Sequence, residues 1–255
     1  MFHPTAIVHP GAQVGPGCEI GPYCVVGEHV TLGEKCKLHS HVVIDGHTRL
    51  GRENEIFPFA SIGLKTQDLK WKGGLTRVEI GDGNTFRECV TIHSATGDGE
   101  VTSVGSQNHI LAYCHIAHNC VLGDHIIMSN VATLAGHVTV GDYAVIGGLV
   151  AIHQFCRIGK MSMIGGCSKV VQDVPPFMLA DGNPAETRTI NKIGMERNGI
   201  SETVQSALRQ AYKILFREGL TIGNALVLLD KELPKVEEVQ YLVQFVQSSQ
   251  RGISK

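Results

Sequence analysis

The sequence lacks several features that would place it in a familiar class. Its 255 residues contain no CxxC pair, and no window approaches the length of a membrane-spanning helix. The first residues, MFHPTAIVHP, have no basic segment followed by an apolar run, which a secretory signal would need. We therefore expect a cytoplasmic protein without an integral membrane segment.

The sequence also lacks a large excess of charge of either sign. The 22 Lys and Arg residues nearly balance the 24 Asp and Glu residues, which leaves a formal net charge of -2. A chain without a broad basic field is not expected to bind nucleic acid or an anionic membrane over a large surface. Any polyanionic ligand must then be held by a few local groups.

Cysteine is not scarce, but its spacing argues against zinc and against disulfides. Six of the eight cysteines are separated by multiples of six, namely Cys18, Cys24, Cys36, Cys114, Cys120 and Cys156. Free cysteine behaves as a small apolar residue in protein cores. We expect these six to be reduced packing residues.

The same period governs the large apolar residues from Val8 to Val170. Counted in steps of six, 25 of 28 positions are large and apolar, whereas the 43% hydrophobic composition would place about 12. The exceptions are Asp68, Gly74 and Asp98. A period of six fits neither the 3.6 of an α-helix nor the 2 of a strand. It predicts a solenoid of short strands, each with one aliphatic side chain turned inward.

Glycine often follows the aliphatic position, as at Gly15, Gly21, Gly27 and Gly33. These repeats resemble the hexapeptide-repeat superfamily, which implies a mainly β fold, the left-handed parallel β-helix, with three hexads in each coil. Residues 18 apart are then vertical neighbours, separated by roughly the 4.8 Å spacing of paired strands.

Two segments interrupt the repeat without changing its phase. Residues 64–79 are polar and carry the single Trp, and residues 94–103 are rich in Gly and acidic. We expect both to be loops pushed out from a β-helical domain that spans residues 1–175. Loops on a rigid scaffold often carry binding residues.

From residue 176 the spacing becomes helical, which predicts a C-terminal α-helical domain over residues 176–255. The prolines of the DVPP segment end the repeat, because proline cannot donate to a strand ladder. The expected helices are Ala185–Asn198, a helix from the cap Ser201 to about Arg217, one capped by Thr221, and Val236–Ser249. Their apolar faces fit core packing, with the docking of a carrier protein as the alternative.

The segment HIAHNC, residues 115–120, places His115 and His118 three residues apart. A catalytic zinc site needs three converging ligands, for which His125 and His137 are the other candidates. The His-x4-His pair typical of zinc-binding hexapeptide proteins is absent. We therefore predict no metal.

Vertical stacking offers a catalytic interpretation instead. Steps of 18 align His118, Gly136 and Gln154 in one column, with His137 and His153 beside it. His118 could remove a proton from a hydroxyl, and the Gly136 N–H could stabilise a tetrahedral oxyanion. The column therefore predicts acyl transfer.

Several local motifs, including HIAHNC, LAGH, HQF, QDVPP and DGNPA, resemble the UDP-N-acetylglucosamine acyltransferase family along essentially the whole chain. This resemblance implies transfer of a (3-hydroxy)acyl chain from acyl carrier protein to the 3-hydroxyl of UDP-N-acetylglucosamine, the first step of lipid A biosynthesis. It also implies a homotrimer with active sites between subunits and no cofactor.

The resemblance assigns roles residue by residue. His118 matches the catalytic base and Gly136 the oxyanion donor, while Gly166, with Met163 nearby, matches a ruler for acyl length. The expected substrate-binding residues are Asp68, Lys70, His115, His137, His153, Gln154, Asn191 and Arg197, of which the last two match positions at the nucleotide end.

The sequence departs from the family at several positions. Asn119 stands where many members have Asp, so a supporting carboxylate for His118 is missing from that position. Ile193 and Asn198 replace charged residues at the nucleotide end, and HSAT replaces HRGT at residues 93–96. These changes leave open whether the acceptor group is a 3-hydroxyl or a 3-amine.

Three alternatives remain at the level of the sequence. A sugar N-acyltransferase of the same superfamily would carry an additional N-terminal domain, whereas the repeat here starts at Val8. An acetyl-CoA-dependent acetyltransferase would use a short donor. A non-catalytic β-helix scaffold would need no histidine column.

Overall fold

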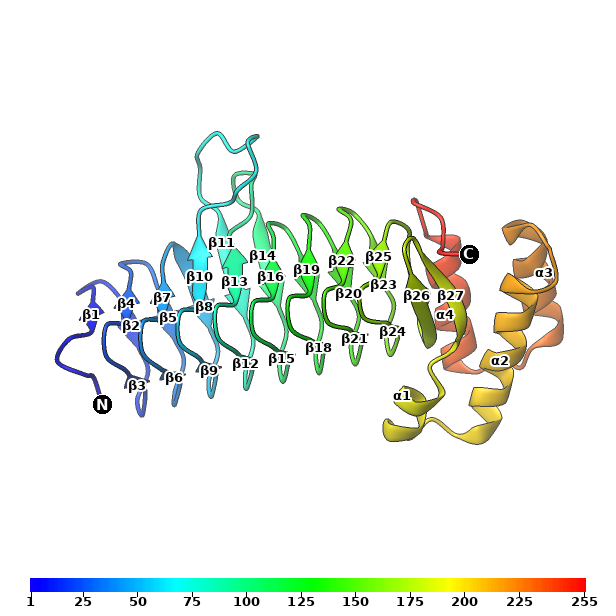
Figure 1. Cartoon of the computed structure of the whole chain (residues 1–255), viewed down its shortest axis with the longest axis horizontal. Coiled ribbons are helices and arrows are strands. Elements are labelled where there is room, and N and C mark those ends of the chain that lie inside the picture. Colours follow the sequence, from blue (N-terminus) through cyan, green and yellow to red (C-terminus); the bar gives the residue numbers. More distant parts are fainter.

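The chain forms a parallel β-helix with three long sheets, followed by a small helical unit (Figure 1); the computed structural model describes residues 1–255. Sheet 1 contains β1 (Ile7–Val8), β4 (Val25–Val26), β7 (Val43–Ile44), β10 (Ser61–Leu64), β13 (Thr91–His93), β16 (His115–Ile116), β19 (Thr133–Leu134), β22 (Ala151–Ile152) and β25 (Lys169–Val170). Sheet 2 contains β2 (Gln13–Val14), β5 (Thr31–Leu32), β8 (His47–Leu50), β11 (Arg77–Ile80), β14 (Val101–Val104), β17 (Val121–Leu122), β20 (Thr139–Val140) and β23 (Arg157–Ile158). Sheet 3 contains β3 (Glu19–Ile20), β6 (Lys37–Leu38), β9 (Glu55–Ile56), β12 (Thr85–Phe86), β15 (His109–Ile110), β18 (Ile127–Met128), β21 (Val145–Ile146), β24 (Met163–Ile164), β26 (Met178–Gly182) and β27 (Ala185–Ile190).

The six-residue period sets this architecture. Most strands are two residues long, with the first side chain outward and the second, aliphatic one buried. The apolar positions of the repeat are all buried except Val8 and Val14 in the first coil. Because the chain visits sheets 1, 2 and 3 in turn, we name the line of turns between sheets 1 and 2 the first edge. The second edge joins sheets 2 and 3, and the third edge joins sheets 3 and 1.

Both interruptions leave from the first edge. The first runs from β10 in sheet 1 to β11 in sheet 2, and the second runs from β13 to β14. Figure 1 shows the first projecting far from the helix wall, beside the shorter second one. Leu50 pairs with Ile80, and Ile80 pairs with Val104, so the first loop adds two hexads to a coil and the second adds one. Whole hexads preserve the phase of the repeat, as the sequence predicted.

The cysteines of the repeat pack as expected. All eight cysteines of the chain are free, and the six of the repeat are buried. The thiols of all but Cys156 donate to backbone carbonyls of the next coil; Cys24 Sγ lies 2.7 Å from the oxygen of His39, and Cys120 Sγ lies 3.2 Å from that of Ala135. Burial raises the pKa of Cys114 to about 11 and that of Cys120 to about 12, so both stay protonated and unreactive.

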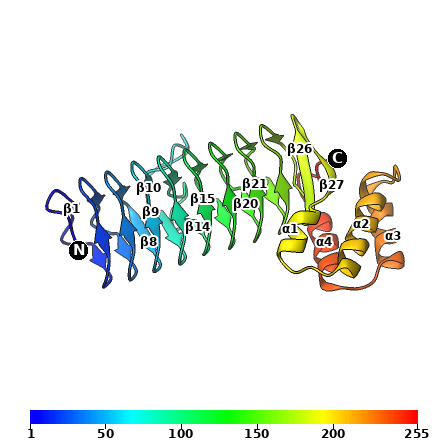
Figure 2. The same cartoon turned by 60° about the horizontal axis from the view of Figure 1, so that its bottom comes forward.

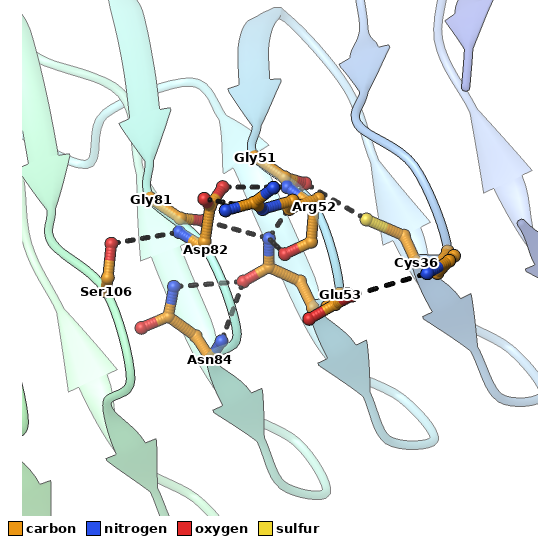
Figure 3. Close-up of polar contacts among 10 residues, drawn as sticks. Cys36, Gly51, Arg52, Glu53, Gly81, Asp82, Asn84 and Ser106 are labelled. Atoms are coloured by element: carbon orange, nitrogen blue, oxygen red, sulfur yellow. Dashed lines mark hydrogen bonds and ion pairs between the residues drawn. The ribbon is translucent and has the colours of Figure 1, made fainter. Parts of the chain in front are cut away.

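Inside the second edge, asparagines replace cysteine at the same position of the repeat in successive coils. The Oδ1 atom of Asn54 accepts from the side-chain nitrogen of Asn84 at 2.9 Å, and the Oδ1 atom of Asn84 accepts from the backbone N–H of Asn108 at 2.9 Å. Below them, Cys36 Sγ donates to Gly51 O at 3.1 Å (Figure 3). These bonds satisfy buried polar groups inside the coils that carry the loops.

The C-terminal region departs from the prediction at one place. The expected helix Ala185–Asn198 is wrong in its first half, because Ala185–Ile190 forms β27, antiparallel to β26. β26 in turn pairs with β24, so this hairpin covers the open end of sheet 3, a contact that local spacing does not reveal. The helix α1 begins only at Lys192 and ends at Arg197.

The other three helices agree with the sequence. α2 (Glu202–Phe216) is capped by Ser201, α3 (Ile222–Glu232) by Thr221, and α4 (Glu237–Gln247) follows Val236. They pack on one another beyond the last coils (Figure 2), around a core that includes Leu208 and Leu242. None of the helices combines the length and apolarity that crossing a bilayer would require.

Candidate active site

The HIAHNC segment begins as strand β16 and turns at the first edge before β17. Asn119 has a φ of 60°, a region that asparagine tolerates better than most residues. Its backbone N–H donates to Thr102 Oγ1 at 2.8 Å. The turn that carries His118 is therefore anchored to the coil below.

Neighbouring side chains fix the orientation of the His118 ring. Its Nδ1 lies 2.9 Å from the Oδ1 atom of Asn119, which also accepts from the backbone N–H of Thr96 at 3.1 Å. An amide oxygen only accepts, so Nδ1 carries the proton and Nε2 of the neutral ring has a free lone pair. The Nε2 atom faces the Asp68 carboxylate at 3.7 Å, and the side chain of His118 is 15% exposed.

Gly136 lies directly against this imidazole. Leu134 pairs with Ile116, which places Gly136 one coil above His118, and a Cβ on Gly136 would overlap the ring. The N–H of Gly136 makes no hydrogen bond to the protein. The strand ladder does not need an N–H at this position of the hexad. Proline, which has no N–H, occupies the same position in other coils, at Pro16 and Pro58. A glycine with an unused backbone N–H thus lies beside His118.

His137 borders the base on the same edge. Its ring meets that of His118 edge to face, with centroids 5.2 Å apart, and stacks on Phe155 at 4.7 Å. Burial, and then the charge of His118, lower the pKa of His137. His137 is therefore neutral at pH 7 and can donate or accept a hydrogen bond.

His115 lies deeper, on β16 itself. Its Nδ1 is 2.7 Å from Thr91 Oγ1, and its ring lies 5.1 Å from that of the buried His93. Burial lowers the pKa of His115 to about 4, and it also lowers that of His93. Both rings are neutral polar groups beneath the loops.

The first loop supplies Asp68 and Lys70. The Asp68 N–H donates to Thr66 Oγ1 at 3.1 Å, and Thr66 Oγ1 lies 3.1 Å from Thr96 Oγ1. The Lys70 N–H donates to Asp68 Oδ1 at 2.9 Å, which is the main cause of the lowered pKa of that carboxyl. Asp68 is thus an ionised group held over Nε2 of His118, while the side chain of Lys70 is exposed beside it.

The second loop supplies Glu100. Its Oε2 accepts from the Asn119 side-chain nitrogen at 2.7 Å and from the Gly97 N–H at 2.7 Å. These two bonds, in that order, lower the pKa of Glu100. A carboxylate therefore touches the residue that orients the base.

The remaining expected site residues divide among the edges. His153 and Gln154 follow β22 on the first edge, exposed and one coil above Gly136. Gly166 lies on the third edge, exposed, with Met163 on β24. Asn191 and Arg197 lie at the second edge: Asn191 is buried, caps α1, and donates from its side chain to Met161 O at 2.9 Å, while Arg197 is exposed. A single chain thus gathers most of the expected residues on the first edge. Met163, Gly166, Asn191 and Arg197 lie elsewhere.

No three His, Cys, Asp or Glu residues converge as metal ligands would. A hollow of about 800 Å³ lies at the N-terminal end between Phe2 and Pro58 and includes none of the site residues. In the single chain, the His118 side chain is 15% exposed and lies beside Asp68 of the first loop.

Sequence reasoning missed Glu100, Thr66 and Thr96 as parts of the site. All three lie in or beside the loops, where no period relates a residue to its neighbours in space. An acidic residue within the Gly-rich second loop was visible, but nothing in the sequence connected it to Asn119.

Comparison with known proteins gives consistent matches. The family model described as UDP-N-acetylglucosamine O-acyltransferase, domain 2, matches residues 173–254, and the bacterial transferase hexapeptide model matches residues 3–34. LpxA from Acinetobacter baumannii is 46% identical, covers 100% of this chain and 99% of its own, and superposes with a TM-score of 0.96. These matches confirm the expected fold, a left-handed parallel β-helix with C-terminal helices.

More distant structures agree over the full length. LpxA of Bacteroides fragilis, a UDP-N-acetylglucosamine acyltransferase, is 37% identical with a TM-score of 0.98 and covers 100% of both chains. The UDP-N-acetylglucosamine acyltransferase of Arabidopsis is 36% identical with a TM-score of 0.89, again covering 100% of both chains.

Proposed function

Because the chain belongs to the UDP-N-acetylglucosamine acyltransferase family, we propose that it transfers a (3-hydroxy)acyl chain from acyl carrier protein to the 3-hydroxyl of UDP-N-acetylglucosamine. One observation carries this proposal beyond the family assignment: His118, oriented through its Nδ1, lies against the free N–H of Gly136. Base and oxyanion donor are the two groups that acyl transfer needs.

The reaction begins at Nε2 of His118. This atom takes the proton of the acceptor hydroxyl while the oxygen attacks the thioester carbonyl, so that a new C–O bond forms. Asp68, whose carboxylate faces Nε2 at 3.7 Å, stabilises the imidazolium that results. General base catalysis of this kind contributes about a hundredfold or more to the rate.

The tetrahedral intermediate then places negative charge on the former carbonyl oxygen. The Gly136 N–H is available to this oxygen because the strand ladder does not use it. One such donor contributes about a hundredfold. When the intermediate collapses, the C–S bond breaks, and the imidazolium returns its proton to the leaving thiolate.

We propose that the working enzyme is a homotrimer whose sites lie between subunits. In one chain, Gly166 is on the third edge and Arg197 at the second, whereas His118 is on the first. Residues on different edges of one prism face different directions, so a neighbouring subunit must supply them if they act on one substrate. On this arrangement Gly166 and Met163 bound the acyl groove, and Asn191 and Arg197 hold the nucleotide end; a guanidinium suits a pyrophosphate.

The free thiols support a reducing compartment. All eight cysteines are unpaired, including the exposed Cys167. Thiols stay reduced in the cytoplasm, which is where we place this protein.

A mass-spectrometric assay tests the function. The purified protein is incubated with UDP-N-acetylglucosamine, a ladder of acyl carrier proteins of increasing chain length, and EDTA. We expect an O-acylated sugar nucleotide from long acyl chains, with EDTA present. Products only from acetyl-CoA, or only from a 3-amino sugar nucleotide, would contradict the proposal.

A further inference from the structure

We propose that Glu100 is a positioning residue for His118 and acts through the amide of Asn119; this rests on the proposed function. The Asn119 side chain joins the two groups, because its nitrogen donates to Glu100 Oε2 at 2.7 Å and its oxygen accepts from His118 Nδ1 at 2.9 Å. The relay runs from the second loop, through the turn of β16, to the base.

The carboxylate determines which way the amide points. In the observed orientation, the Asn119 oxygen meets two N–H groups, from His118 and Thr96, and its nitrogen meets a carboxylate. A flipped amide would set its oxygen against Glu100 and its nitrogen against two donors. Glu100 thus helps to keep the proton on Nδ1 of His118 and the lone pair on Nε2.

The relay also carries charge. Two hydrogen bonds, chiefly the one from Asn119, lower the pKa of Glu100, so its carboxylate is ionised at neutral pH. A chain of hydrogen bonds that ends in an anion polarises its members, which favours the imidazolium formed during catalysis. The carboxylate that the sequence lacks at position 119 is thus supplied one residue further out, by the second loop.

Other charged and titratable groups also face His118. Asp68 lies opposite Nε2, His137 meets the ring edge to face, and the charge of His118 also acts on His93 and His115. Lys70 acts on Asp68 and His137. These side chains stay unchanged in the activity variants below, while the charge of Glu100 itself acts on His137 as well as on His118.

The first test is Glu100→Gln. A single oxygen of Glu100 accepts from both Asn119 and Gly97, so a glutamine oxygen can keep both bonds while the charge is lost. We expect kcat to fall about fivefold with KM unchanged, and the acid limb of the kcat/KM profile to move down by about half a pH unit. A profile that superposes on that of the wild type would overturn the proposal.

The second test exchanges the amide and the carboxylate between positions 119 and 100. In the wild type, the Asn119 side-chain nitrogen lies 2.7 Å from Glu100 Oε2. Asn119→Asp alone replaces this nitrogen by a carboxylate oxygen, so the two carboxylates repel each other and kcat is expected to fall by about tenfold or more. Adding Glu100→Gln removes the repulsion and lets the glutamine nitrogen donate to the new carboxylate in place of accepting from the Gly97 N–H, so kcat of the double variant should rise at least about threefold above that of Asn119→Asp. A double variant no more active than Asn119→Asp would refute the relay.

A third readout does not depend on turnover. Nitrogen-15 spectra of histidine-labelled trimer, with the His118 signals assigned from His118→Ala, report which ring nitrogen carries the proton. We expect the Nδ1-protonated form in the wild type and a mixture of tautomers in Glu100→Ala. The same tautomer in both would sink the positioning role, whereas a wild type that transfers no acyl chain would sink only the proposed function.

Discussion

The first edge of the β-helix carries two pairs of neighbouring imidazoles that differ in almost everything except their place in the repeat. His29 and His47 stack in parallel, with centroids 4.3 Å apart and rings inclined by 4°. His118 and His137 meet edge to face, at 5.2 Å and 89°. His29, His118 and His137 lie in turns that follow strands of sheet 1, whereas His47 is the first residue of β8 in sheet 2.

The surroundings make the difference. The side chain of His29 is 53% exposed, its nearest carboxylate is that of Glu28 at 4.0 Å, and neither ring of this pair makes a hydrogen bond. His118 is held by Asn119, covered by Asp68 and set against a glycine. His47 also lies near the first loop, where it lines a hollow with Lys65 and Trp71, so the hydrogen bond to Asn119 and the contact with Gly136 are what single out His118.

The largest effect is expected from removing one imidazole of each pair. His118→Ala should lower kcat at least about a hundredfold, because the general base is lost. His47→Ala, the matched control, should leave kcat within about twofold of the wild type. The measurement is turnover with acyl carrier protein and sugar nucleotide both saturating. Equal losses of kcat in the two variants would contradict the difference between the two pairs.

Gly136→Ala should have the next largest effect. The new methyl group would overlap the His118 ring and push it from its place, so kcat should fall roughly thirtyfold. The melting temperature should stay nearly constant, because the nearest atoms that the methyl group would meet belong to the His118 side chain and not to the backbone. Gly223→Ala is the control, since a Cβ there meets no atom within 4 Å; its activity should not change.

Asp68→Asn tests the carboxylate of the active pair. The substitution keeps the side-chain shape but removes the charge that faces Nε2, so we expect kcat/KM for the sugar nucleotide to fall about tenfold. Glu28→Gln changes the carboxylate beside His29 and should have no effect. A wild-type rate for Asp68→Asn would show that the loop charge does not serve the base.

The smallest effect concerns pH and stability. The pKa of His115 falls from 6.5 to about 4 on folding, so between these values the unfolded chain binds more protons and stability is lost as the pH falls. His115→Asn should therefore reduce the drop in melting temperature between pH 7 and pH 4.5 by about 5 °C. His29→Asn, at the exposed pair, should leave the drop unchanged; calorimetry at several pH values compares them.

Much of the fold could be predicted from the sequence, because the repeat depends on local burial. The buried aliphatic positions, the cysteine positions and the whole hexads of the loops all follow from counting in sixes. The prediction of a helix at Ala185–Asn198 was wrong in its first half, which lies beyond the end of the repeat. Ala185–Ile190 became a strand because the hairpin with β26 covers sheet 3, and no local pattern encodes that contact.

For the site, the sequence placed His118 and Gly136 in vertical register, but it could not reveal the loop contacts. The links from Glu100 to Asn119 and from Thr66 to Thr96 join residues of separate segments through side chains. The sequence also could not show that Gly166, Arg197 and His118 lie on three different edges.

The amino-acid order by itself determined the solenoid, the phase of its coils and the stacking of His118 beneath Gly136, because each hexad buries its aliphatic residue independently of distant segments. Only the tertiary structure decided which imidazole is oriented, covered and linked to carboxylates. Those contacts depend on where two irregular loops settle, and loop conformation is set by long-range side-chain packing and hydrogen bonds, which have no period in the sequence.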